Sequence, residues 1–416
     1  MASPAPRRIA HLVHLFPPES HGGTQSYVRA LAKAQAAAGD QVRVICGSND
    51  LGRGRILASE RMGEVTVHRF YREPEERFSG DLGCERLSDE ITAFVEGFGA
   101  DMVHLHHWSG LSSNLVRRLA AAGLPVVVTL HDLFVTCARH FRMPDHHNFC
   151  QRDVGIEDCA QCLAPDLVGF DGPRILSALS KRRDDFAAEL RTARRVLTVS
   201  DAQRDLLLSI PGLEGQDLKT FPIGVPGSFA PPSTRSQGPL EPGRLVVANW
   251  GGLDPRKGLG DLLQAIHHTG QANAYRVEVW GGGLDTDYGR DVQKLAAGIE
   301  VHFHGRYEDA ELLSFGSKAD VAVFPFLAFE TYGLVVDEAL RLDLPVLVSA
   351  HGAPPERLGE SGDCFPAGNI EALAIRLELL RNQPENLLAH RQGKHGARSF
   401  ADHRRALQAL YDEVLS

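Results

Sequence analysis

Short apolar runs alternate with amphipathic segments along the first half of the chain. The runs have the length of buried strands and comprise Ile9–Leu15, Val42–Cys46, Met102–Leu105, Val126–Leu130 and Val196–Val199. Segments with helical periodicity, such as Ser26–Ala38 and Leu111–Ala121, lie between them. Because this alternation contains no long series of hairpins, it predicts βαβ units and a doubly wound parallel sheet covered by helices. We expect a first α/β domain over residues 1–225.

A second series of the same kind follows a segment with neither periodicity. Residues 226–243 are rich in Pro and small polar residues and are typical of a linker. The strands expected after it are Leu245–Trp250, Val277–Trp280, Val301–His304, Val321–Pro325 and Pro345–Ser349. The sequence thus predicts a second Rossmann-like domain over 244–400, facing the first across a central cleft in which the strand ends bind ligand.

The end of the chain has helical periodicity. We expect helices over Pro384–Phe400 and Ala401–Leu415, and residues 401–416 to pack back on the N-terminal domain.

Size and composition narrow the class of protein. The chain has 416 residues, which exceeds the ~250–300 at which a single core stops growing. Its net charge of -9 gives no general attraction to nucleic acid or anionic lipid. Because no apolar run approaches the ~20 residues of a membrane span and no signal peptide is evident, we expect a cytoplasmic protein with at most peripheral contact at the inner membrane face. The basic residues Lys181, Arg182, Arg183, Arg191, Arg194 and Arg195 fit a solvated helix better than a membrane contact.

Two glutamates eight residues apart mark a predicted strand-to-helix junction. The segment Phe324–Gly333 leaves a strand and enters a helix over Leu334–Arg341, whose free N–H groups favour an anion. Eight residues are a little over two helical turns, so Glu330 and Glu338 face one side of the same ligand. Carboxylates suit sugar and ribose hydroxyls, although two unrelated surface acids would give the same spacing.

The surrounding residues resemble a known signature. Phe329-Glu330-Thr331-Tyr332-Gly333, closed by Glu338-Ala339, resembles the E-x7-E motif of the retaining family-4 glycosyltransferases, which have the GT-B fold. The resemblance implies that Glu330 contacts the donor sugar and Glu338 the ribose. The donor-binding residues that it implies in this segment are Glu330, Thr331, Tyr332, Gly333, Leu334 and Glu338.

The loop after the first strand of the second domain resembles the phosphate-contacting loop of the same family. It reads Gly251-Gly252-Leu253-Asp254-Pro255-Arg256-Lys257-Gly258. A lysine at this place stabilises negative charge on the departing phosphate, so Lys257 is our first catalytic candidate. Glu330 and His131 are the other two. Family members often carry an arginine where this chain has Gly252, so Arg256 is either the second cation of the donor site or a solvated loop residue.

Other strand ends match the family more weakly. Gly22 and Gly23 resemble the family's N-terminal glycine loop, and His131 resembles its histidine that contacts the transferred sugar. Gly282 and Arg306 lie at strand ends where the family surrounds the nucleotide. Ordinary strand-to-helix turns would also contain such glycines. The histidines His104, His106 and His107 either line the acceptor side or pack structurally, and Ser200 is expected to cap a helix.

Four cysteines cluster with the spacing C-x12-C-x8-C-x2-C. They are Cys137, Cys150, Cys159 and Cys162. A close pair after two more cysteines is typical of a structural zinc site, so we expect zinc to pin the insertion 137–162. The alternatives are reduced thiols, two disulfides, or a site in which His140, His146 or His147 replaces a cysteine. The isolated Cys46, Cys84 and Cys364 are expected to be buried.

The resemblance implies a reaction. A hexosyl or N-acetylhexosaminyl group moves, with retention, from a nucleotide-diphosphate sugar to a hydroxyl of a saccharide, a lipid-linked saccharide or a small molecule. Such products belong to cell-surface polysaccharides, glycolipids or natural-product glycosides. No catalytic cofactor is expected, since no Asp-x-Asp pair follows a predicted strand and the diphosphate is neutralised by Lys257 and helix amides. The alternatives are a phosphorylase, a nucleotide-sugar epimerase or a non-catalytic sugar-nucleotide-binding subunit.

Overall fold

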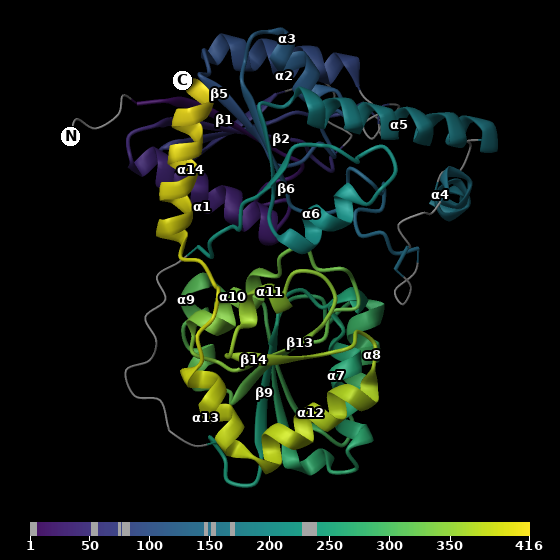
Figure 1. The fold of residues 1–416 in the computed structure, drawn as a ribbon, viewed down its shortest axis with the longest axis vertical. Coiled ribbons are helices and arrows are strands. Elements are labelled where there is room, and N and C mark those ends of the chain that lie inside the picture. Colours follow the sequence, from purple (N-terminus) through teal and green to yellow (C-terminus); the bar gives the residue numbers. More distant parts are fainter. Residues whose placement is uncertain are drawn as a thin grey trace. The chain divides into compact units, whose positions relative to one another are not determined.

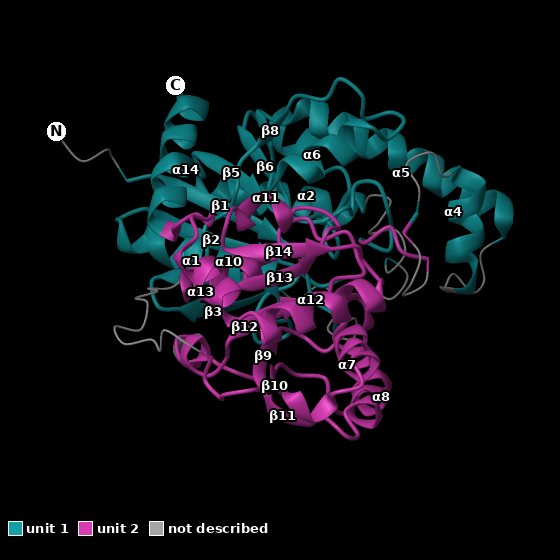
Figure 2. Cartoon of the chain, turned by 60° about the horizontal axis from the view of Figure 1, so that its bottom comes forward, with its two compact units in different colours: residues 1–140, 150–226, 401–416 teal, residues 141–149, 227–400 magenta. Residues whose placement is uncertain are grey.

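The computed structural model describes residues 6–50, 57–73, 76, 84–144, 149–150, 155–166, 171–226 and 239–416. The chain forms two compact units, which Figure 2 distinguishes by colour. Unit 1 comprises residues 1–140, 150–226 and 401–416, and unit 2 comprises residues 141–149 and 227–400. Most of the predicted linker, residues 227–238, lies outside the described residues, as do His146 and His147.

Unit 1 is built on an eight-stranded sheet of order β3-β4-β2-β1-β5-β6-β7-β8, parallel except for β3. Its strands are β1 (Arg8–Val13), β2 (Gln41–Cys46), β3 (Ala58–Met62), β4 (Val65–Arg69), β5 (Met102–Leu105), β6 (Val126–Leu130), β7 (Arg195–Thr198) and β8 (Leu218–Thr220). Its helices are α1 (Gly23–Ala37), α2 (Glu85–Phe98), α3 (Leu115–Ala121), α4 (Ile156–Leu163), α5 (Gly172–Thr192), α6 (Asp201–Leu208) and α14 (Phe400–Leu415).

Unit 2 has a wholly parallel six-stranded sheet of order β11-β10-β9-β12-β13-β14 (Figure 2), and its helices are labelled in Figure 1. Its strands are β9 (Leu245–Trp250), β10 (Tyr275–Trp280), β11 (Glu300–Gly305), β12 (Val321–Phe324), β13 (Val346–Ser349) and β14 (Gly362–Phe365). Its helices are α7 (Leu259–His268), α8 (Asp287–Leu295), α9 (Asp309–Leu312), α10 (Leu334–Arg341), α11 (Pro355–Leu358), α12 (Ile370–Asn382) and α13 (Pro384–Gln392). Two apolar clusters, one on each face of this sheet, form its core.

The predicted fold class is confirmed, since both units are parallel α/β layers. Every apolar run that was expected to be a strand is one, with ends shifted by at most two residues. Strands such as β6 and β12 are buried at every position, because helices cover both faces of the sheet. Four strands, β3, β4, β8 and β14, have no counterpart among the predicted runs. β3 lies at the sheet edge and is largely exposed, so it carries no apolar pattern.

Several predicted helices have different bounds in the structure, and the helix expected over Ser26–Ala38 is α1, which begins at Gly23. The expected helix Pro384–Phe400 is wrong beyond Gln392, where α13 ends before Gly393 and an irregular segment runs to α14. The backbone here bonds to other elements, since Glu360 N donates to Lys394 O and Gly396 N to Arg357 O. The helix expected from Leu111 begins four residues later, at Leu115.

The C-terminal helix α14 belongs to unit 1. Tyr411 is fully buried and its hydroxyl lies 2.5 Å from His104 Nδ1 on β5. Arg404 donates to the carbonyl oxygen of Ala34 on α1 at 3.1 Å. The last helix of the sequence therefore completes the fold of the first unit.

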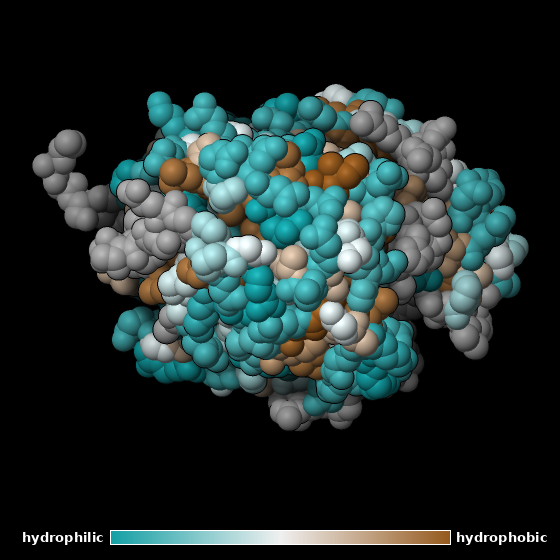
Figure 3. Space-filling model, turned by 90° about the horizontal axis from the view of Figure 1, so that it is seen from below, coloured by the Kyte–Doolittle hydropathy of each residue, from teal (hydrophilic) through white to brown (hydrophobic). Residues whose placement is uncertain are grey.

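None of the described helices is both long enough and apolar enough to cross a membrane. The face drawn in Figure 3 is mainly hydrophilic, with hydrophobic residues in separate small patches. The basic residues of α5 are not all solvated as expected. Arg182 is buried and its guanidinium lies over the Phe134 and Phe186 rings, while Lys181 pairs with Asp185.

Candidate functional site

The strand order of unit 2 reverses between two neighbouring strands, β9 and β12. Ligands of open α/β sheets bind at such a switch point, beyond the carboxyl ends of the strands. The loop after β9 carries Lys257, and the loop after β12 carries Glu330. The Asn249 side chain, near the end of β9, donates to Val323 O on β12 at 2.8 Å and joins the two strand ends. Adjacent strands thus bring together residues that are far apart in sequence.

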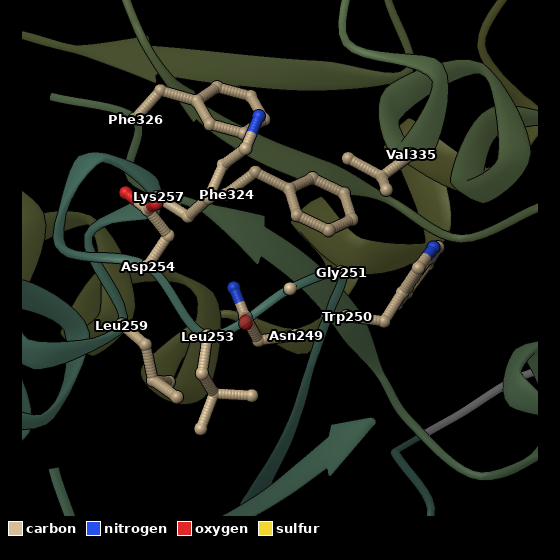
Figure 4. Close-up of a pocket in the computed structure, with 11 residues that line it drawn as sticks. Asn249, Trp250, Gly251, Leu253, Asp254, Lys257, Leu259, Phe324, Phe326 and Val335 are labelled. Atoms are coloured by element: carbon tan, nitrogen blue, oxygen red, sulfur yellow. The ribbon is translucent and has the colours of Figure 1, made fainter. Parts of the chain in front are cut away.

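A pocket opens between these two loops (Figure 4). Its lining is Asn249, Trp250, Gly251, Gly252, Leu253, Asp254, Lys257, Leu259, Phe324, Phe326 and Val335. The side of the pocket at Lys257 carries charge, and the ammonium of Lys257 lies 5.0 Å from the centre of the Phe326 ring. The pocket therefore pairs an apolar wall with a cation, an arrangement that suits a partly apolar anion.

Lys257 and Glu330 form an ion pair. Lys257 Nζ lies 2.6 Å from Glu330 Oε2, and the side chains are 45% and 16% exposed. The backbone of Glu330 is held at both ends, since its N–H donates to His351 O at 3.3 Å and its carbonyl accepts from Ala353 N at 2.8 Å. The carboxylate is thus placed by the loop, and the ammonium, with three N–H donors, keeps the capacity to bind a second anion.

Glu338 has a different partner from Glu330. The indole N–H of Trp250, the last residue of β9, donates to Glu338 Oε2 at 2.7 Å. Glu338 lies on α10, whose first turn also places Val335 in the pocket wall. The indole bond orients this carboxylate on the side of the helix that faces the end of β9.

A buried arginine supports the segment from Glu330 to α10. Arg357 donates to the Asp337 carboxylate and to Tyr332 O, and its guanidinium lies 3.9 Å from the centre of the Tyr332 ring. The Tyr332 hydroxyl donates to the other oxygen of Asp337 at 2.8 Å. Gly333 begins the helix with φ of 80°, where a side chain would be strained, and a Cβ would lie 3.1 Å from Glu330 Cγ. Thr331 and Leu334 occupy the same segment, with Thr331 buried.

Arg256 is engaged within its own loop. Its guanidinium donates twice to the Asp254 carboxylate, at 2.6 and 2.7 Å, and lies 3.8 Å from the centre of the Phe141 ring. Of the two expected cations, Lys257 lines the pocket and Arg256 does not.

The loops after β10 and β11 pack against the loop after β9. Gly281 N donates to Gly305 O at 2.7 Å, and Leu253 N donates to Gly282 O at 2.9 Å. The side chain of Arg306 lies over Gly282, where a Cβ would come within 3.1 Å of the arginine Nε. Gly282 and Arg306 therefore belong to one group of strand-end loops with the Lys257 loop, and neither lines the pocket.

In unit 1, the candidate residues follow the strand ends β1, β5 and β6. Gly22 is the N-cap of α1 and Gly23 its first residue. His131 directly follows β6, and its Nε2 lies 3.0 Å from His106 Nδ1. His106 Nε2 lies 3.0 Å from His11 Nδ1, so that three imidazoles form a continuous hydrogen-bonded chain. Burial lowers the pKa of each of them, and that of His11 to about 4, so the chain is neutral at pH 7.

Asp132, beside His131, bonds two other histidines. His107 Nε2 and His140 Nδ1 lie 3.1 and 3.2 Å from Asp132 Oδ2. The amide of Ser109 donates to His107 Nδ1, which leaves the proton of a neutral His107 on Nε2, facing the carboxylate. Burial opposes ionisation of Asp132, but the neighbouring imidazoles outweigh it and hold its pKa well below the usual value.

The four clustered cysteines are reduced and partly exposed. Within the described residues, two groups of side chains bring at least three possible metal ligands within 4.8 Å of one another, and neither contains a cysteine. The cysteine sulfurs are therefore not gathered as the tetrahedral site expected from the spacing requires. Cys46 and Cys84 are buried as expected, whereas Cys364 is partly exposed. Ser200 caps α6 as expected, accepting from Gln203 N at 3.1 Å.

Several residues of these sites were not anticipated from the sequence. Trp250 and Arg357 hold two neighbouring residues of α10, Glu338 and Asp337, and Asp254 holds Arg256. Trp250 ends a predicted strand directly before the loop that carries Lys257, a position that could have identified it. Nothing in the local sequence around Arg357 signals its partner Asp337, twenty residues away.

Two family models match the chain. "Glycosyl transferase 4-like domain" matches residues 22–224, and "Glycosyl transferases group 1" matches residues 232–398. The second model includes the Lys257 loop, Glu330 and Glu338, and the first includes His131.

Characterised relatives are similar over most of their length. The chain is 25% identical to a phosphatidyl-myo-inositol mannosyltransferase of Mycobacterium leprae, over 87% of this chain and 84% of the relative. It is also 25% identical to an MMP alpha-(1->4)-mannosyltransferase of Mycolicibacterium hassiacum, over 91% and 90%.

Solved structures share the fold. Sucrose-phosphate synthase from Thermosynechococcus elongatus has a TM-score of 0.68 at 20% identity, covering 98% of this chain and 99% of that one. HepE of Anabaena, in complex with UDP and glucose, has a TM-score of 0.66 at 14% identity, with coverage of 98% and 99%.

Proposed function

The chain belongs to the family-4 glycosyltransferases of the GT-B fold, and we propose that it moves a hexosyl or N-acetylhexosaminyl group, with retention, from a nucleotide-diphosphate sugar to a hydroxyl acceptor. The observation that carries this proposal is the Lys257–Glu330 pair, 2.6 Å apart, beside a pocket at the switch point of unit 2. A cation and a carboxylate side by side match a donor that has a diphosphate next to a sugar rich in hydroxyls.

Lys257 acts on the leaving group. As the bond between the anomeric carbon and the diphosphate oxygen breaks, negative charge grows on that oxygen, and a placed ammonium stabilises it. Lys257 donates to the diphosphate with one N–H while another remains on Glu330. The departing phosphate takes the proton of the acceptor hydroxyl, which attacks the same face of the sugar.

The other residues bind and orient the donor. Glu330 accepts hydrogen bonds from hydroxyls of the transferred sugar, and Glu338, oriented by Trp250, accepts from the ribose. The N–H groups at the start of α10 add dipolar stabilisation for the diphosphate. His131 contacts a hydroxyl of the transferred sugar. These groups neutralise the donor without a catalytic metal, so activity should persist in a chelator.

A donor screen followed by an acceptor screen tests the function. A nucleotide sugar that binds stabilises the folded protein and so raises its melting temperature. At a ligand concentration of 100 times Kd, the added stability is ~2.7 kcal/mol. Because two relatives are mannosyltransferases, nucleotide-diphosphate mannoses are the first donors to test, and inositol phospholipids and saccharides the first acceptors. We expect nucleotide diphosphate to be released only when a hydroxyl acceptor is present, and the product to keep the anomeric configuration of the donor.

Three outcomes would contradict the proposal. Turnover of the donor with inorganic phosphate as acceptor would indicate a phosphorylase. Conversion of the donor sugar to its epimer without an acceptor would indicate an epimerase. Donor binding without turnover by any acceptor, unchanged by Lys257→Ala, would indicate a non-catalytic binding subunit.

A further inference from the structure

A chain of buried hydrogen bonds runs from α1 to His131. His11 on β1 and His104 on β5 are paired in register, so they share a face of the sheet, and His106 lies two residues beyond His104 on the same face. His104, His11 and His106 are each at most 1% exposed. Gln35 of α1 covers this face, and its Oε1 lies 2.7 Å from His11 Nε2. The imidazole rings are thus packed against one another, and the amide of Gln35 terminates their series of hydrogen bonds. We call the series Gln35–His11–His106–His131 the relay.

The protons of this chain are ordered by its first member. A neutral imidazole carries one N–H and one lone pair, and an amide oxygen only accepts. Since Gln35 Oε1 accepts, His11 carries its proton on Nε2 and offers a lone pair on Nδ1. His106 must then donate from Nε2 to His11, which leaves a lone pair on His106 Nδ1. His131 must in turn donate from Nε2 to His106, which leaves His131 Nδ1 unprotonated.

The Gln35 side chain also contacts Tyr411 on α14. Burial raises the pKa of Tyr411, and a hydrogen bond with Gln35 opposes that rise. Since the amide oxygen of Gln35 lies at His11, the amide N–H groups are the atoms left to serve Tyr411.

We propose that Gln35 is a positioning residue, which acts through His11 and His106 to hold His131 in the tautomer that has its proton on Nε2 and a hydrogen-bond acceptor at Nδ1. The proposal rests on the proposed function of His131 at the transferred sugar. With this tautomer, His131 accepts a hydrogen bond from a sugar hydroxyl, whereas the opposite tautomer would present an N–H to it. Because the imidazoles of the relay are buried and neutral, none of them takes up a second proton at pH 7, and the positions of their N–H protons stay the same.

His104 belongs to the same cluster but does not set the order. Its two ring nitrogens bond the hydroxyls of Tyr411 and Thr129, at 2.5 and 2.8 Å. Because a hydroxyl both donates and accepts, either tautomer of His104 is satisfied. Thr129 is 2% exposed and hence as buried as the relay, which makes Thr129→Val a matched control.

Nitrogen NMR of protein labelled with 15N-histidine tests the proposal, with the His131 signals assigned by their loss in His131→Gln. In the wild type we expect a protonated Nε2 and an unprotonated Nδ1 at His131. Gln35→Met removes the acceptor at nearly the same volume, so both orders become possible and His131 should become a mixture of tautomers. Thr129→Val should leave His131 unchanged. We also expect kcat to fall by at least ~10-fold in Gln35→Met, with the KM for donor within about 3-fold.

The outcomes separate this proposal from the proposed function. A wild-type His131 with its proton on Nδ1 overturns the relay without any variant having to fold. The same result follows if the His131 spectrum of folded Gln35→Met matches the wild type. A mixed tautomer with unchanged kcat would overturn the link to transfer. If the wild type transfers no sugar, the proposed function fails while the spectrum still decides the order of the relay.

Discussion

Lys257 donates to Glu330 across the two loops that end β9 and β12, with Nζ and Oε2 2.6 Å apart. The lysine is 45% exposed, and ion pairs of this kind add little to stability. The pair is therefore better explained by what it does to a ligand than by what it does to the fold.

Removing the cation should separate activity from stability. We expect Lys257→Ala to lower kcat for transfer by ~100-fold or more, because charge on the leaving diphosphate loses its partner, while the melting temperature stays close to that of the wild type. Lys294→Ala is the control, since it removes an ion pair of similar length with Asp291, on the surface of α8. Equal activities of the two variants would show that Lys257 is not part of the chemistry.

Glu338 should contribute to nucleotide affinity. Hydrogen bonds to a charged group are worth about 1.5–3 kcal/mol, so Glu338→Ala should raise the Kd for the nucleotide diphosphate roughly 10- to 100-fold. Trp250→Phe keeps the carboxylate and removes the indole donor, so its effect should be smaller. Titration calorimetry measures both, and an unchanged Kd in Glu338→Ala would make the ribose assignment wrong.

Arg357 should stabilise the segment that carries Glu330. Arg357→Met leaves Asp337, which is fully buried, without its cation. Loss of one partner of a buried pair costs about 3–5 kcal/mol, so the free energy of unfolding of unit 2 should fall by about that amount in a urea titration. Arg357→Met with Asp337→Asn removes both charges and should recover part of the loss. If the single variant were as stable as the wild type, the pair would not support this loop.

The strands, and the strand-to-helix junction that carries Glu330 and Glu338, could be predicted from the sequence because both patterns are local. β5, β6 and β12 are buried throughout, so an apolar run is enough to identify them. The relay could not be predicted, since it depends on β1 lying next to β5 and on α1 covering the same face, which no local pattern encodes. The contact between Phe141 and Arg256 could not be predicted either, because the two residues are far apart in the sequence.

Acid should destabilise the protein before its carboxylates titrate. Burial lowers the pKa of His11 to about 4, and holds those of His104 and His106 well below their usual value. The unfolded chain binds protons at these groups below pH ~6.5 while the folded chain does not, so stability is present above that pH and is lost as the pH falls toward 4. Each such histidine contributes a loss of up to ~1.4 kcal/mol per pH unit. Urea titrations at pH 7, 6 and 5 should show this loss, and equal stability at all three would contradict neutral burial.

The cysteine cluster remains a predicted zinc site. Cys137, Cys150, Cys159 and Cys162 are not gathered in the structure, and residues 145–148 and 151–154 between them lie outside its described part. Four thiolates would have to come together around the ion, so bound zinc should cross-link the insertion and raise its resistance to proteolysis. Elemental analysis should find about one zinc per chain in the wild type, and none in Cys159→Ser with Cys162→Ser. Cys46→Ser, at a buried thiol elsewhere in unit 1, should keep the metal. Wild-type protein purified without chelator and free of zinc would show that the four cysteines are ordinary thiols.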